Sequence, residues 1–258
     1  MLVREGLDMT RAEKIIEAMS KLGGPKWESQ LTFLQGLLED EFPSGAAYRS
    51  SVWAKWVERI EKSEQQESRY LKEEHERISS SRQIDNCPFD PGDWLAEASW
   101  LSGELSENMY AALVVSVWST AEGLFKKTVA ECQHALQISG KVPYRFDEIR
   151  TVFKKQLSIE LKDLPDYKTV DAIRNLNNCY KHTAGYYKPK KLHEKIDQGL
   201  IQKWQFLDQD EIEEGRRIHY DGLPIEEMVA ACHTFFNALF DAVLFELRNR
   251  KGQTPNAP

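Results

Sequence analysis

Apolar residues recur every three or four positions along most of this chain, the spacing of helices that bury one face. The pattern predicts helices over residues 10–22, 25–42, 48–80, 93–105, 109–136, 146–161, 165–182 and 224–250. Residues 186–222 carry no clear period and are interpreted as loop with short strands or helical turns. The sequence therefore predicts an all-α fold, a helical bundle with an additional N-terminal helical region.

The polar positions suggest how these helices are divided into domains. Residues 61–69 contain no apolar residue, and few occur up to residue 80, so residues 61–80 are predicted to form a helix that stands in solvent or serves as an arm for a partner. Residues 79–93 are rich in turn-forming types and make the best boundary. We therefore expect an N-terminal helical region at 1–80, a second helical domain at 92–250 and a disordered tail at 251–258.

Composition narrows the function classes. The chain has 258 residues, 41% of them apolar, and a net charge of −7, which fits a globular protein and argues against coating nucleic acid over the whole surface. Its four cysteines are far apart and form no CxxC pair, so neither a zinc knuckle nor a disulfide framework is expected. No HExxH, Walker-type, GxGxxG or GxSxG motif is present. We expect no metal and no cofactor.

No membrane segment or leader is expected. The two most apolar runs, Tyr110–Trp118 and Phe235–Phe245, are too short to cross a bilayer. The first residues lack the apolar core of a signal peptide. These features predict a soluble, cytoplasmic protein.

The helix with the most informative polar face is VDAIRNLNNCYKHTAG, residues 170–185. At about 100° per residue, one face is apolar apart from Asn177, and carries Val170, Ile173, Leu176 and Tyr180. The opposite arc, with Lys181 at its edge, is polar and carries Asp171, Arg174, Asn175, Asn178 and His182. Arg174, Asn178 and His182 are spaced four residues apart and so lie along one side of the helix.

This polar set has the groups that cleave RNA without a metal. His182 is a candidate general acid or base, because an imidazole titrates near neutral pH. Arg174 and Lys181 can hold a phosphate, and Asn178 can orient the imidazole or a phosphate oxygen. The alternative is an ordinary solvated helix face whose last basic residues interact favourably with the helix dipole.

Residues 105–250 resemble the HEPN superfamily, helical bundles of prokaryotic toxins, defence proteins and CRISPR-linked ribonucleases. The likeness lies in VVSVWSTAEGLFKK, where Glu122 matches a recurrent family acid, and in RNLNNCYKH, which is similar to the family's Arg-x4–6-His and Asn-x-x-Lys-His motifs. The resemblance implies that His182 is catalytic, that Arg174 and Asn175 open the motif, and that a homodimer forms a composite RNA-cleaving cleft. Seven residues separate Arg174 from His182, so Asn178 or Lys181 alternatively takes the place of the family arginine.

Charge is unevenly distributed around this motif. Residues 121–200 contain 15 lysines and arginines against 10 aspartates and glutamates, a balance of +5 that leaves −12 for the rest of the chain. The basic segment at residues 186–195 offers candidate RNA-binding side chains, namely Tyr186, Tyr187, Lys188, Lys190, Lys191 and Lys195. A lysine-rich loop in solvent is the alternative interpretation.

Three functions remain open from the sequence. The first is a HEPN-like, metal-independent ribonuclease, a toxin or anti-phage defence effector controlled by an antitoxin or other defence-system protein. The second is a non-catalytic scaffold of the same fold that binds RNA or protein. The third is a regulatory subunit of a nucleotidyltransferase, for which the AMP acceptors would be Tyr180, Tyr186 or Tyr187.

Overall fold

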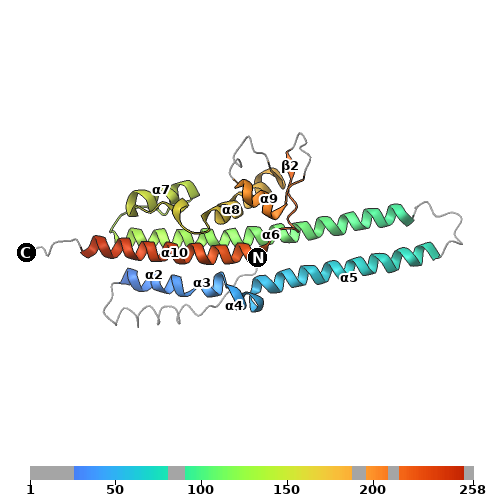
Figure 1. Cartoon of the computed structure of the whole chain (residues 1–258), viewed down its shortest axis with the longest axis horizontal. Coiled ribbons are helices and arrows are strands. Elements are labelled where there is room, and N and C mark those ends of the chain that lie inside the picture. Colours follow the sequence, from blue (N-terminus) through green and yellow to red (C-terminus); the bar gives the residue numbers. More distant parts are fainter. Residues whose placement is uncertain (1–25, 81–90, 188–195, 209–214, 253–258) are drawn as a thin grey trace, which may run out of the picture. The chain divides into compact units, whose positions relative to one another are not determined.

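The computed structural model describes residues 26–80, 91–187, 196–208 and 215–252. These residues form an all-α helical bundle with one two-stranded sheet, as the sequence predicted (Figure 1). The elements are α2 (Lys26–Gly36), α3 (Leu38–Glu41), α4 (Gly45–Ser50), α5 (Val52–Ser80), α6 (Pro91–Ala135), α7 (Phe146–Leu157), the 3₁₀ helix η1 (Leu161–Asp163), α8 (Tyr167–Thr183), β1 (Tyr186–Tyr187), α9 (Gln198–Trp204), β2 (Arg216–Arg217) and α10 (Ile225–Gly252).

The chain divides into two compact units. The first unit consists of residues 1–44, 119–170 and 229–258, and the second of residues 45–118 and 171–228. Each unit combines segments from both sides of residues 81–90, whereas the sequence predicted consecutive regions at 1–80 and 92–250. The division falls within α6, α8 and α10, so these three helices contribute residues to both units.

The first unit is held together by aromatic packing between helices. Phe125 of α6 lies 4.8 Å from Phe236 of α10 and 6.4 Å from Phe153 of α7, measured between ring centroids. Phe42, just after α3, stacks on Phe236 at 6.0 Å. All four rings are fully buried. The apolar stripes of helices far apart in the sequence thus meet in one core.

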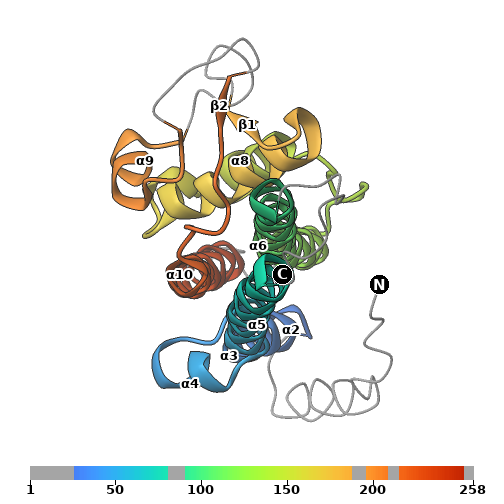
Figure 2. The same ribbon diagram turned by 90° about the vertical axis from the view of Figure 1, so that its right-hand side faces the viewer.

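In the second unit, α5 and the N-terminal part of α6 lie side by side and run antiparallel (Figures 1 and 2). Ile60 and Leu71 of α5 are buried, and the Ser106 hydroxyl donates a hydrogen bond to the Glu64 carboxylate. Apart from half-buried Glu64, residues 61–70 are exposed, as predicted for this helix. In the second half of the predicted range 61–80, however, Leu71 is buried and residues 74, 75, 78 and 79 are half-buried. The exposed face of residues 61–69 follows from the absence of apolar side chains there.

Two predicted helices are in fact one. The pattern suggested separate segments at 93–105 and 109–136, but α6 runs unbroken through 45 residues. The intervening Ser106 is buried against α5, and Asn108 bonds the backbone of its own helix. The polar side chains of Ser106 and Asn108 make hydrogen bonds to α5 and to the backbone of α6. They interrupt the apolar spacing without interrupting the helix.

The segment that had no clear period contains the short elements expected of it. β1 pairs antiparallel with β2, with Tyr186 opposite Arg217, and α9 begins after Asp197, whose carboxylate accepts a hydrogen bond from the Gly199 amide. Gly185 ends α8 with a φ of +86°, a conformation that favours glycine. The helix predicted at 10–22 lies outside the described residues. So does the predicted tail, except for its first two residues, which continue α10.

Within the described residues, one helix satisfies the length and composition of a membrane span, Ile225–Arg250 of α10. The run considered in the sequence, Phe235–Phe245, is only its central part. In the structure 56% of the apolar 18-residue stretch of this helix is buried, as in the core helix of a folded domain. This feature is weak evidence for a membrane.

Candidate functional site

Helix α8 is buried over most of its length. Val170, Ile173 and Leu176 are fully buried, as their shared face predicted. The polar arc differs from the expectation, because Asp171 and Asn175 are buried as well. From Thr169 to Cys179 the helix is therefore covered on both faces, with Arg174 and Asn178 half-buried. Lys168 near its start and its C-terminal end reach solvent.

Arg174, a predicted catalytic residue, is held by an acid one turn earlier. Its Nε and Nη2 both lie 2.9 Å from Oδ1 of Asp171, and the two side chains are only 16% and 12% exposed. Asn175 donates from Nδ2 to the other oxygen of Asp171, at 3.3 Å. The motif's opening residues thus form a mostly buried network within the second unit.

Lys181 and His182 lie at the other end of the helix and are exposed. The side chain of His182 makes no hydrogen bond or ion pair with any described residue. Asn178 is half-buried, and its Oδ1 accepts a hydrogen bond from Asn177. Since eight residues of helix rise about 12 Å, Arg174 and His182 of one chain are not neighbours.

Glu122, the predicted family acid, belongs to the other unit. It forms a half-exposed ion pair with Lys126, at 2.7 Å, one turn later on α6. Lys126 in turn lies over the ring of Tyr144, at 4.6 Å from its centroid. These contacts give Glu122 a local structural role within the first unit.

The two candidate base-stacking tyrosines have different surroundings. Tyr187 is only 4% exposed, so its ring is not available to stack on a base, contrary to the expectation. Tyr186 is half-buried and borders a pocket of about 230 Å³. The remaining predicted RNA-binding residues, Lys188, Lys190, Lys191 and Lys195, lie outside the described residues.

This pocket is built from α6, the end of α8 and the small sheet. Its polar lining includes Glu104, Glu107, Asn108, Tyr180, Arg217 and Tyr220. The Tyr180 hydroxyl donates to Oδ1 of Asn108, at 3.2 Å, and the ring of Tyr180 packs edge-on against Tyr220. Arg217 donates hydrogen bonds to Glu104 and to Glu107, which raise the pKa of its guanidinium. Arg217 is thus fixed as a cation.

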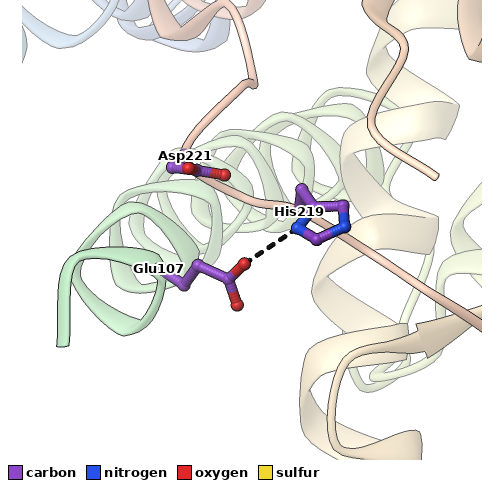
Figure 3. A group of neighbouring side chains, drawn as sticks. All are labelled: Glu107, His219 and Asp221. Atoms are coloured by element: carbon purple, nitrogen blue, oxygen red, sulfur yellow. Dashed lines mark hydrogen bonds and ion pairs between the residues drawn. The ribbon is translucent and has the colours of Figure 1, made fainter. Parts of the chain in front are cut away.

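His219 lies beside this pocket in a cluster of acids (Figure 3). Its Nδ1 is 2.9 Å from Oε1 of Glu107, and its Nε2 is 2.5 Å from Oδ1 of Asp208. The carboxylate of Asp221 completes a group whose ligand atoms all lie within 4.8 Å of one another. The hydrogen bond to Asp208, followed by that to Glu107, raises the pKa of His219 in spite of its partial burial.

Sequence reasoning did not assign this cluster. Glu107 lies on a long helix and His219 lies 112 residues later in the segment without a period. No short motif connects them. Glu107 and His219 come together only in the folded structure, because they lie far apart in the sequence.

Tyr220 fixes this loop to α8, which gives a testable prediction. Its buried hydroxyl donates a hydrogen bond to the backbone carbonyl of Leu176, at 3.0 Å, and burial raises its pKa. Tyr220→Phe should lower the free energy of unfolding by about 1 kcal/mol, the typical net contribution of one hydrogen bond. Urea denaturation followed by circular dichroism measures this. Tyr70→Phe, at an exposed ring, is the control and should change nothing; equal effects of both would contradict the prediction.

Comparison of the chain with protein-family models, with curated proteins and with solved structures found no match in any of the three. The resemblance to the HEPN superfamily therefore rests on the sequence motifs alone.

Proposed function

We propose that this chain is a HEPN-like, metal-independent endoribonuclease that acts as a toxin or anti-phage defence effector. One observation carries the proposal: α8 is buried along most of its length, yet it ends in an exposed lysine and an exposed histidine, Lys181 and His182. The sequence resemblance selects the same histidine.

The chemistry of these groups suits cleavage at a 2′-hydroxyl. An imidazole takes the proton of the 2′-hydroxyl as its oxygen attacks phosphorus, which forms a 2′,3′-cyclic phosphate. The bond to the 5′-oxygen breaks, and an acid returns a proton to that oxygen. Lys181 stabilises the negative charge on the phosphate oxygens. Tyr186 is half-buried and can stack on a base.

The reaction needs both an acid and a base, and one chain supplies a single exposed histidine on this helix. We therefore propose that two copies bring their α8 ends together, so that one His182 acts as base and the other as acid. Trp100, Leu101 and Leu105 of α6 expose apolar surface in the same unit, which is available to a second copy or a partner protein. A cytoplasmic location and control by an antitoxin-like protein complete the proposal.

A second candidate is a non-catalytic RNA-binding or scaffold module. The pairing of Arg174 with Asp171 favours it, because the paired guanidinium is largely neutralised and most of it is hidden from solvent. In that case the exposed Lys181 would hold a phosphate without cutting the strand.

The test uses the full chain with a labelled single-stranded RNA in the presence of EDTA. We expect cleavage to 2′,3′-cyclic phosphate products, and we expect His182→Ala to lower the rate by roughly 10²–10⁴-fold. The matched control is His134→Ala, at an exposed histidine of the first unit, which should leave the rate unchanged. Binding without cleavage would support the second candidate. Equal cleavage by His182→Ala and wild type would contradict the proposal.

A further inference from the structure

One imidazole and two carboxylates surround a common point in the second unit (Figure 3). They belong to His219, Glu107 and Asp221. Nδ1 of His219 and Oε1 of Glu107 are already 2.9 Å apart. Asp221 is exposed, whereas the other two are half-buried, so the group is open to solvent on one side. Three protein ligands with an open position are typical of a transition-metal site that also binds water.

The other nitrogen of His219 is oriented in the way that metal sites require. Nε2 lies 2.5 Å from Oδ1 of Asp208, so this carboxylate accepts the remaining ring N–H. A metal-binding histidine almost always donates its second N–H to such an acceptor, which fixes the ring and raises its basicity. Asp208 thus occupies the place of such an acceptor, and it is not itself one of the three ligands.

The charge of the surroundings also favours a cation. Four carboxylates lie here, those of Glu104, Glu107, Asp208 and Asp221. Arg217 forms ion pairs with two of them, Glu104 and Glu107. Arg217 bonds the second oxygen of Glu107, Oε2, so Oε1 is left for the cluster. Glu64 adds further negative charge near Asp221. The acids exceed the compensation that Arg217 and a protonated His219 supply.

We propose that Glu107, His219 and Asp221 bind one divalent transition-metal ion, with zinc as the best fit, and that Asp208 orients the imidazole. The metal replaces the proton on Nδ1 of His219, while Nε2 keeps its proton and donates it to Asp208. A nitrogen ligand beside two carboxylates favours zinc or manganese over magnesium and calcium, which prefer oxygen alone.

The site joins α6 to the loop before α10 within one unit. Glu107 comes from the helix, and His219 and Asp221 come from the loop that follows β2. A metal that binds both segments in the folded state, but not in the unfolded chain, stabilises the fold. The proposal goes beyond the proposed ribonuclease activity, which needs no metal.

The test is isothermal titration of the full chain with zinc chloride, followed by thermal unfolding with and without zinc. We expect one zinc ion per chain and a rise in melting temperature. Asp221→Asn and His219→Gln should each weaken binding by at least 10-fold, and Asp208→Asn by roughly 10–100-fold. His233→Gln is the matched control, because this histidine also pairs with a carboxylate, Glu39, at 2.9 Å in the other unit.

Asp221 is exposed, so Asp221→Asn tests the site without loss of the fold. Cobalt supplies a second readout, since its visible absorption reports on the ligands directly. We expect weak d–d bands without thiolate charge transfer, and their loss in Asp221→Asn. Absence of stoichiometric binding, thiolate bands, or equal affinity in wild type and both ligand variants would overturn the proposal. RNA cleavage in EDTA is independent of these outcomes, so either proposal can fail alone.

Discussion

Replacing Phe236 by alanine is expected to lower the free energy of unfolding by about 3–5 kcal/mol, the usual cost of truncating a buried phenylalanine. The ring is fully buried and lies 4.8 Å from Phe125, 5.3 Å from Phe235 and 6.0 Å from Phe42. Its removal deletes contacts with α6 and with the residue after α3, and it leaves a cavity. Urea denaturation followed by circular dichroism measures the loss.

The same helix offers a matched control. Phe245 is 63% exposed, so Phe245→Ala removes the same atoms with almost no change in burial. This variant should shift the unfolding midpoint little. Equal losses in both variants would contradict the assignment of Phe236 to the core of the first unit.

Replacing Asp171 by alanine is expected to cost about 3 kcal/mol or more in unfolding free energy. Arg174 would keep its charge in a largely buried position while losing the carboxylate 2.9 Å away, and Asn175 would lose an acceptor. Breaking a buried ion pair by removing one partner is more destabilising than removing both, because a buried charge remains uncompensated. The same denaturation experiment measures this cost.

A double-mutant cycle separates pairing from packing. Asp171→Ala combined with Arg174→Leu should recover part of the stability lost in Asp171→Ala alone. The exposed pair Glu58 and Lys62, treated in the same way, provides the comparison and should show a much weaker coupling. Additive effects at positions 171 and 174 would show that the pair has no special role. The cycle also bears on function, since an arginine that Asp171 holds is not free to bind phosphate.

Local pattern was a good guide where one face of a helix is buried. Ile149, Phe153 and Leu157 of α7 are fully buried, as their helical spacing predicted, and Trp27, Leu31 and Leu34 of α2 are buried too. The pattern was a poor guide to where helices end. The predicted helix at 146–161 stops at Leu157, because Ser158 adopts a left-handed conformation with φ of 60° and its amide bonds the last helical carbonyls.

The candidate site was predicted in part. Exposure of Lys181 and His182 agrees with their place on the polar arc, whereas Asp171 and Asn175 share that arc and are buried. Periodicity assumes that the side opposite the apolar stripe faces water, but α8 is covered on both sides. A buried polar side chain is stable when its hydrogen bonds are made, as in the network around Asp171.

By itself, the sequence determined the helical class, the apolar stripes that form the cores, and the solvated face of α5, because these depend on spacing within one segment. Only the tertiary structure decided that His219 meets Glu107 and Asp208, and that Asp171 neutralises Arg174 inside a covered helix. Hydrophobic periodicity is a property of neighbouring residues. Charge compensation and ligand geometry arise between groups that folding brings together from distant parts of the chain, or whose surroundings folding changes from water to protein.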